Sequence, residues 1–151
     1  PPQSRQPRLI FNPPKQDSGK NELERNGFGI LFTLINHELF VLLGKRSSNA
    51  SVAPGLWGPP GGIVNRGERS RDCAIREIKE ETGLYVQFLR FFAAGEKCDW
   101  FVGIVDSNTM WSSHAQTDKH ELGQINMNDP FLNNCHSPFH GHVWFPIIKI
   151  I

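Results

Sequence analysis

A chain of 151 residues is long enough for one domain with a hydrophobic core of its own. Sixteen basic residues balance fifteen acidic ones, so no large excess charge is present to recruit nucleic acid or a membrane. No apolar run approaches the roughly 18 residues of a membrane span. The cysteines, Cys73, Cys98 and Cys135, are too scattered for a zinc site or a disulfide framework. We therefore expect a soluble protein without a membrane partner, in a reducing compartment such as the cytoplasm.

The first part of the chain differs in composition from the rest. Residues 1–26 carry five prolines among polar side chains, which opposes both helix and sheet, so we expect a flexible arm. From Gly27 onward the sequence is that of a folded domain, expected to span residues 27–151. Apolar runs at residues 27–35 and 39–46 are typical of β-strands, and the Asn-His-Glu between them indicates a hairpin turn.

The middle of the chain predicts a loop followed by a helix. Residues 47–62 are rich in Ser, Pro and Gly and indicate a loop. We expect a brief strand at residues 63–64. A charged helix follows near Arg69–Thr82, and Gly83 occupies the position of a glycine C-cap.

The remaining elements are mostly strands. Apolar runs at residues 84–94 and 100–106 predict two of them. Residues 107–141 are polar and have no clear period, which in a compact domain indicates a functional or a disordered loop. The last strand begins at His142 and turns at Pro146. Strands, one helix and further strands in this order predict an α+β fold with a mixed sheet.

The predicted helix carries a glutamate stripe, formed by Glu77, Glu80 and Glu81 at i, i+3 and i+4. Like charges at this spacing repel one another in water by roughly a few tenths of a kcal/mol per pair. A divalent cation would reverse that repulsion, and oxygen ligands without Cys or His suit Mg²⁺ or Mn²⁺ better than zinc. The alternative is an ordinary solvated face, which is common on helices rich in Glu and Lys.

The residues around the stripe favour the metal site. Together they form the pattern G-x5-E-x7-R-E-U-x-E-E-x-G-U, where U is aliphatic. Its seven fixed positions would recur by chance in about one window in 10⁸. Those positions are Gly62, Glu68, Arg76, Glu77, Glu80, Glu81 and Gly83. A solvated face does not require such a pattern.

This pattern resembles the Nudix box of the Nudix hydrolase family (MutT-like). The sequence from Trp57 to Gly62 is similar to the W-x-x-P-G-G segment that precedes the box in many members, and the likeness extends over residues 27–106. The resemblance implies a Nudix α/β/α sandwich in which the box forms loop, helix and loop. It also implies hydrolysis of a nucleoside diphosphate linked to another group, X, dependent on Mg²⁺ or Mn²⁺.

The resemblance also implies roles for the residues of the box. Arg76 is expected to pair with a carboxylate of the box, either Glu68 or Glu77. Glu80 or Glu77 is expected to orient the attacking water. The expected metal ligands are the carbonyl of Gly62 and the carboxylates of Glu77, Glu80 and Glu81.

Candidates outside the box are less specific. Glu121 lies where some relatives have a further base or metal ligand, although a surface glutamate would look the same. Lys45 and Arg46 follow a strand and suit contacts with phosphate, or simply solubility. Trp57 and Phe28 are candidate substrate-binding aromatic residues, because aromatic faces suit nucleobases.

Several functions fit these observations. The first is a diphosphatase acting on nucleoside triphosphates or related nucleotides. The second is hydrolysis of an RNA cap or a dinucleoside polyphosphate; the balanced charge speaks mildly against a long RNA track, although basic residues in the arm leave room for capped RNA. ADP-ribose or a nucleotide sugar is a third substrate class, and a non-catalytic nucleotide-binding module is the alternative outside enzymes. The oligomeric state stays open.

Overall fold

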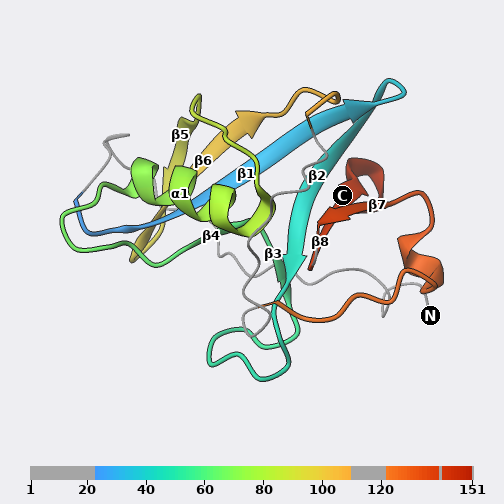
Figure 1. The fold of residues 1–151 in the computed structure, drawn as a ribbon, viewed down its shortest axis with the longest axis horizontal. Helices are drawn as coiled ribbons and strands as arrows, with labels where there is room; N and C mark the ends of the chain where they lie inside the picture. The colour runs from blue at the N-terminus through green and yellow to red at the C-terminus, as the bar shows by residue number, and fades with distance from the viewer. Residues whose placement is uncertain (1–22, 110–121, 140, 151) are drawn as a thin grey trace.

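The computed structural model describes residues 23–109, 122–139 and 141–150. Eight strands form one mixed sheet in the order β5-β6-β1-β2-β8-β7, with β3 paired to β2 and β4 paired to β1. The strands are β1 (Asn26–Ile35), β2 (Glu38–Lys45), β3 (Trp57–Gly58), β4 (Gly61–Gly62), β5 (Arg90–Ala94), β6 (Cys98–Ile104), β7 (His136–Phe139) and β8 (His142–Pro146). The helical elements are α1 (Ser70–Thr82), η2 (Pro130–Leu132) and η3 (Ile147–Lys149). The α+β fold with a mixed sheet is thus confirmed (Figure 1).

The centre of the sheet joins an antiparallel hairpin to a parallel strand. β1 and β2 pair in register from Phe32 with Val41 to Ile35 with Glu38. Between them Asn36 and His37 both have positive φ, 50° and 67°, the conformation that a tight two-residue hairpin turn requires. On its other side β1 runs parallel to β6. The predicted hairpin is therefore confirmed, and the parallel pairing adds a crossover that contains α1.

Local capping and packing explain the limits of α1. Arg69 is the extended N-cap residue, and Gly83 ends the helix in the left-handed conformation (φ 77°) while its N–H bonds the Lys79 carbonyl at 2.8 Å. Ala74 and Ile78 are fully buried against the sheet. The predicted helix is confirmed to within one residue.

The first residues of the described chain attach the start of α1 to the sheet. Leu23 forms an isolated bridge with Arg69. The Arg25 guanidinium donates to the buried Asp99 carboxylate at 3.1 Å and to carbonyls of the β5–β6 hairpin. The Ser70 hydroxyl donates to the other Asp99 oxygen at 2.6 Å. This buried network holds the first turn of the helix against β6.

The two faces of the sheet are covered differently. The cluster on the α1 side includes Ile78, Phe101 and Trp144. The cluster on the opposite side includes Val143 and Phe145, and the side chains packed there come from the segment around η2 and from η3. In the part of the chain that the structure describes, α1 is the one α-helix, so the second helical layer of an α/β/α sandwich is not seen there. The same residues include no helix of the length and apolarity that a membrane crossing needs.

The structure corrects three predicted strands and contains a strand in a stretch predicted to be a loop. Residues 63–64 are not a strand, because the pairing with β1 is made by Gly61–Gly62; Ile63 projects into solvent with 76% of its surface exposed. Residues 84–89 are irregular, so the strand predicted from Leu84 is confined to β5. The strand predicted at residues 100–106 is β6, two residues earlier at each end. β7 lies within the polar stretch predicted to be a loop. It is a strand because it pairs with β8.

Candidate functional site

Arg76 lies at the centre of the acidic cluster. Its Nε and Nη2 atoms each donate to one oxygen of Glu68 at 2.9 Å, and its Nη1 donates to Glu77 Oε1 at 2.8 Å. A longer ion pair of 3.3 Å joins it to Glu80. The hydrogen bonds from Arg76 hold the pKa of Glu68 below its usual value, while Glu68 raises the pKa of the guanidinium. Arg76 therefore pairs with both of the carboxylates that were its predicted alternatives.

Two glycines bring the β4 backbone against the glutamate stripe. A side chain at Gly62 would place its Cβ 2.6 Å from Cδ of Glu77. Any residue other than glycine would therefore displace the Glu77 carboxylate. The Gly61 N–H donates to Glu81 Oε1 at 3.0 Å. β4 thus lies beside two of the three glutamates of the stripe.

Cys73 adds a contact that we did not predict. It lies one turn before Glu77, and its Sγ is 3.4 Å from the Gly62 carbonyl oxygen. Burial raises the pKa of the Cys73 thiol to about 11. The group is consequently a protonated donor near neutral pH, and it is not a thiolate that would attract a soft metal.

The predicted metal ligands, Gly62 and the glutamate stripe, have the chemistry that a hard divalent cation prefers. They consist of carboxylate oxygens and one backbone carbonyl, and Glu80 is 48% exposed and accessible from solvent. Over residues 23–109, 122–139 and 141–150, no three His, Cys, Asp or Glu side chains already converge as a metal cage. Glu77 and Glu80 are hydrogen-bonded to Arg76 and Glu81 to the Gly61 amide. Ligation would therefore require these side chains to rotate away from their present hydrogen-bond partners.

Residues far away in the chain support the loop that leads into α1. The Asn26 side chain accepts the Val64 N–H at 3.0 Å, and the Glu24 N–H donates to the Glu68 carbonyl at 2.9 Å. Within the loop, Glu68 Oε1 accepts the Asn65 N–H. Sequence reasoning missed Asn26 and Glu24, because nothing local in the chain signals contacts with a partner some 40 residues away.

The two basic candidates lie at the end of β2. The Lys45 carbonyl accepts a hydrogen bond from the Gly123 N–H at 2.6 Å, and the Lys45 N–H donates to the Gly141 carbonyl. The Arg46 side chain donates from Nε to the Val52 carbonyl at 2.7 Å, which closes the loop before β3. Arg46 thus has a structural contact within its own loop.

The other candidates are spread over the sheet. Trp57 packs edge-on against Phe145 on the face opposite α1, with ring centroids 5.0 Å apart. Phe28 stacks on Trp100 at 4.9 Å and pairs with Gly61 across β1 and β4. Glu121 lies outside the described residues. The structure thus gathers the residues of the box, while the aromatic candidates make contacts within the protein.

Comparison with known proteins tests the family. The family model described as "NUDIX domain" matches residues 23–147. Nudix hydrolase 2 of Arabidopsis thaliana is 33% identical over 98 residues, which are 65% of this chain and 35% of that protein. The m7GpppN-mRNA hydrolase NUDT17 of Xenopus laevis is 43% identical over 61 residues, 40% of this chain and 20% of that protein. The nucleoside triphosphatase NudI of Salmonella agona is 41% identical over 54 residues, 36% of this chain and 38% of that protein.

A solved structure supports the fold. The apo form of T. brucei MERS1 superposes with a TM-score of 0.63 at 17% identity, over 83% of this chain and 58% of that chain. The matched segments span only between 20% and 38% of the length of these three curated relatives. Since the family model matches well over half of the sequence and the residues of the box meet in space, the chain belongs to the Nudix family.

Proposed function

We propose that this domain hydrolyses a diphosphate linkage in nucleoside diphosphate-X compounds with the help of Mg²⁺ or Mn²⁺. The observation that carries the proposal is the cluster in which Arg76 binds Glu68 and Glu77 beside the Gly61–Gly62 backbone. A solvated helix face needs neither the bidentate arginine nor the glycine pair. Members of the Nudix family generally use divalent metal ions, and the oxygen donors of this cluster suit them.

Each residue of the site has a role in the proposal. The Gly62 carbonyl and the glutamate stripe would hold the ion. When bound, a divalent ion neutralises charge on the diphosphate and lowers the pKa of a water molecule. Glu80 would accept a proton from the attacking water, a role supported by its being the most exposed of the three residues that Arg76 binds. Arg76 fixes the rotamers of the carboxylates around it.

We propose nucleoside triphosphates and related nucleotides as the first substrate class. The relative NudI is named a nucleoside triphosphatase, and in this proposal Lys45, at the end of β2, and the neighbouring Arg46 would supply positive charge for phosphate. Capped RNA is the second candidate, favoured by the likeness to a protein named an m7GpppN-mRNA hydrolase. Dinucleoside polyphosphates, ADP-ribose and nucleotide sugars complete the set of substrates to be compared.

The test is a substrate panel measured with Mg²⁺ and with Mn²⁺. We expect metal-dependent release of phosphate or pyrophosphate, fastest with one of the triphosphates. Glu80→Gln should lower turnover at least a hundredfold, roughly the effect of losing a general base. Glu96→Gln removes an exposed carboxylate in the β5–β6 turn and should leave turnover unchanged.

Other results would lead to different conclusions. Preference for capped RNA would select the second substrate class. Full turnover by Glu80→Gln on every substrate would refute the assigned role of this residue. Nucleotide binding without any release of phosphate or pyrophosphate would identify a binding module in place of an enzyme.

A further inference from the structure

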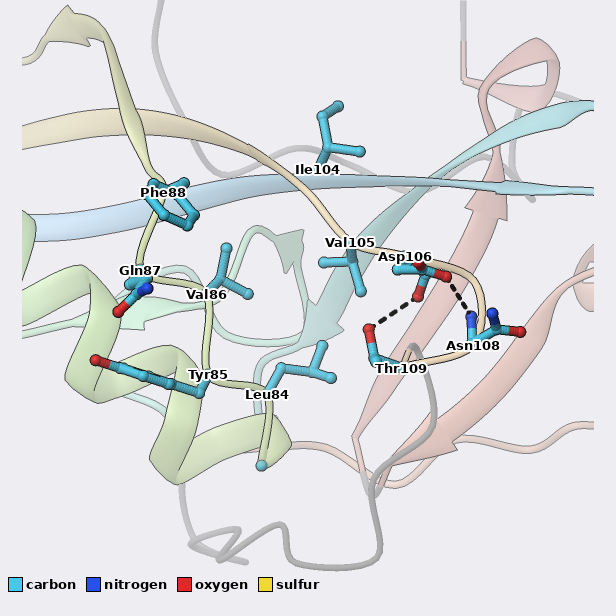
Figure 2. A pocket seen from close by; sticks show the side chains of 11 residues that line it. Leu84, Tyr85, Val86, Gln87, Phe88, Ile104, Val105, Asp106, Asn108 and Thr109 are labelled. Atoms are coloured by element: carbon cyan, nitrogen blue, oxygen red, sulfur yellow. Dashed lines mark hydrogen bonds between the residues drawn. The ribbon is translucent and has the colours of Figure 1, made fainter.

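A cleft lies beyond the C-terminal end of α1, outside the acidic cluster. One wall is the segment that follows the helix, residues 83–88, and the other is the end of β6 with the turn after it, residues 104–109 (Figure 2). Its volume is about 540 Å³. Pockets for small molecules in proteins usually enclose about 300–1,000 Å³, so the cleft is large enough for one aromatic ligand.

About half of the surface that lines the cleft is apolar. Leu84 and Val86 belong to one wall and Val105 to the other. At the rim, Phe88 is 82% exposed and Ile104 is 73% exposed (Figure 2). A flat ligand that covers these large apolar side chains removes apolar surface from water, which favours binding.

Hydrogen bonds at the base of each wall make the cleft a preformed site. The Thr82 hydroxyl donates to the Ile78 carbonyl at 2.6 Å and accepts the Leu84 N–H at 3.1 Å. On the other wall, the buried Thr33 hydroxyl donates to the Val105 carbonyl at 2.7 Å. The Val105 N–H donates to the Phe32 carbonyl, also at 2.7 Å. Little ordering of the backbone is therefore needed when a ligand enters.

Asp106 is the one charged side chain among the described residues that line the cleft, where it lies with the uncharged Gln87, Asn108 and Thr109. Asp106 lines it, and its Oδ1 accepts the Asn108 N–H at 2.8 Å, which fixes the direction of the carboxylate. The helix ends at this place, and the C-terminus of a helix carries a partial negative charge. None of the described residues lining the cleft is basic. A phosphate is disfavoured here, whereas an uncharged ring that donates hydrogen bonds is favoured.

We propose that this cleft binds the base of an aminopurine nucleotide, whose amino group donates to Asp106 while its ring covers Ile104 and Phe88. The inference rests on the proposed function and deepens it, since it separates the base from the diphosphate. Gly83 follows Glu77 by six residues, so a rise of 1.5 Å per residue separates their backbone positions by about 9 Å along the helix axis. In this proposal the ribose and its phosphates would pass the end of α1 to reach the glutamate stripe, which lies against β4.

The experiment measures binding without hydrolysis. Calorimetry in EDTA would compare AMP and GMP with purine riboside monophosphate, which lacks the amino group. We expect Asp106→Asn to weaken binding of the preferred aminopurine nucleotide about tenfold, as for a lost hydrogen bond to a charged group, and to leave purine riboside monophosphate unchanged. Ile104→Ser should weaken the binding of every nucleotide that the wild type binds. The matched controls are Glu96→Gln, at the opposite end of β6, and Ile148→Ser, an exposed isoleucine on η3.

The outcomes separate this inference from the proposed function. If Asp106→Asn and Ile104→Ser bind AMP and GMP as the wild type does, or if neither nucleotide binds in EDTA, the cleft is not the base site. If the nucleotides bind through the cleft and no substrate is hydrolysed, the inference holds and the proposed catalysis fails. If hydrolysis is found and its KM is unaffected by Asp106→Asn, the base lies elsewhere and the catalytic proposal stands.

Discussion

At the scale of single residues, the site depends on how four charged side chains share their hydrogen bonds. Arg76 binds Glu68 through two nitrogens and Glu77 through a third, and it also reaches Glu80. A planar guanidinium can make these contacts at once because its donors point in fixed, different directions. One arginine thus offsets much of the repulsion among the carboxylates.

The geometry of Arg76 predicts that lysine cannot replace it. In Arg76→Lys one ammonium group must choose between Glu68 and Glu77, so the carboxylates lose their shared orientation while the positive charge is retained. We expect metal affinity or turnover to fall about 10–100-fold, the usual effect of removing a group that orients metal ligands. Manganese titration and steady-state kinetics would measure it. Arg90→Lys, at an exposed position at the start of β5, is the control, and equal behaviour of both variants would contradict the role of Arg76.

Glu68 should make stability depend on pH. Its pKa is lowered in the folded state from 4.5, so its contribution is complete above that value and is lost as the pH falls through the lower, folded pKa. The free energy of unfolding of wild type should therefore exceed that of Glu68→Gln at pH 7. The difference should shrink below pH 4.5. Urea denaturation across this range would measure it, and a difference independent of pH would be evidence against the ion pair.

At the scale of elements, glycines set how closely strands approach α1. A Cβ at Gly29 would lie 2.5 Å from the Ile78 side chain, and a Cβ at Gly27 would lie 2.8 Å from the Ala74 amide nitrogen. Both glycines belong to β1, which runs beneath the helix. The close approach lets α1 bury its apolar side while the glutamate stripe reaches β4.

Gly62→Ala tests that close approach within the site. The added methyl group would displace the Glu77 carboxylate, the flexible end of a side chain, while the helix backbone need not move. We expect turnover to fall about tenfold or more while the free energy of unfolding changes little. Ile63→Ala, at the exposed neighbouring position, should leave both unchanged. Normal turnover by Gly62→Ala would show that the position of Glu77 tolerates this shift.

At the scale of the whole molecule, the acidic cluster is joined to the sheet by contacts between protein groups. Arg76 neutralises part of the cluster, the Gly61 amide binds Glu81, and the Arg25–Asp99–Ser70 network fixes the start of the helix. Each of these contacts is made between protein groups. We therefore expect catalysis to need a metal ion and folding not to need one.

EDTA provides the corresponding prediction. We expect the chelator to abolish turnover and to leave the near-ultraviolet circular dichroism and the thermal midpoint almost unchanged, apart from the small stabilisation that a bound ion contributes by mass action. Restoring Mg²⁺ or Mn²⁺ should restore turnover. Unfolding in EDTA would mean that the cluster is a structural metal site.

Elements with local signals were predictable from the sequence. Period, turn residues and capping are properties of neighbouring residues, and they correctly predicted the β1–β2 hairpin and the helix that ends at Gly83. Segments without such a signal were missed. Leu84 to Leu89 is apolar enough to resemble a strand, yet it forms no ladder, while β7 forms one from a polar stretch because β8 lies beside it.

The sequence by itself determined the family pattern, because the spacing of the box, from Gly62 to Leu84, is encoded in one short segment. Only the tertiary structure decided that Gly61 and Gly62 form a strand, that Asn26 and Glu24 support the loop before the helix, and that residues 83–88 and 104–109 enclose a cleft. These contacts join segments distant in the chain, and the packing of the whole sheet, which no local pattern records, selects them.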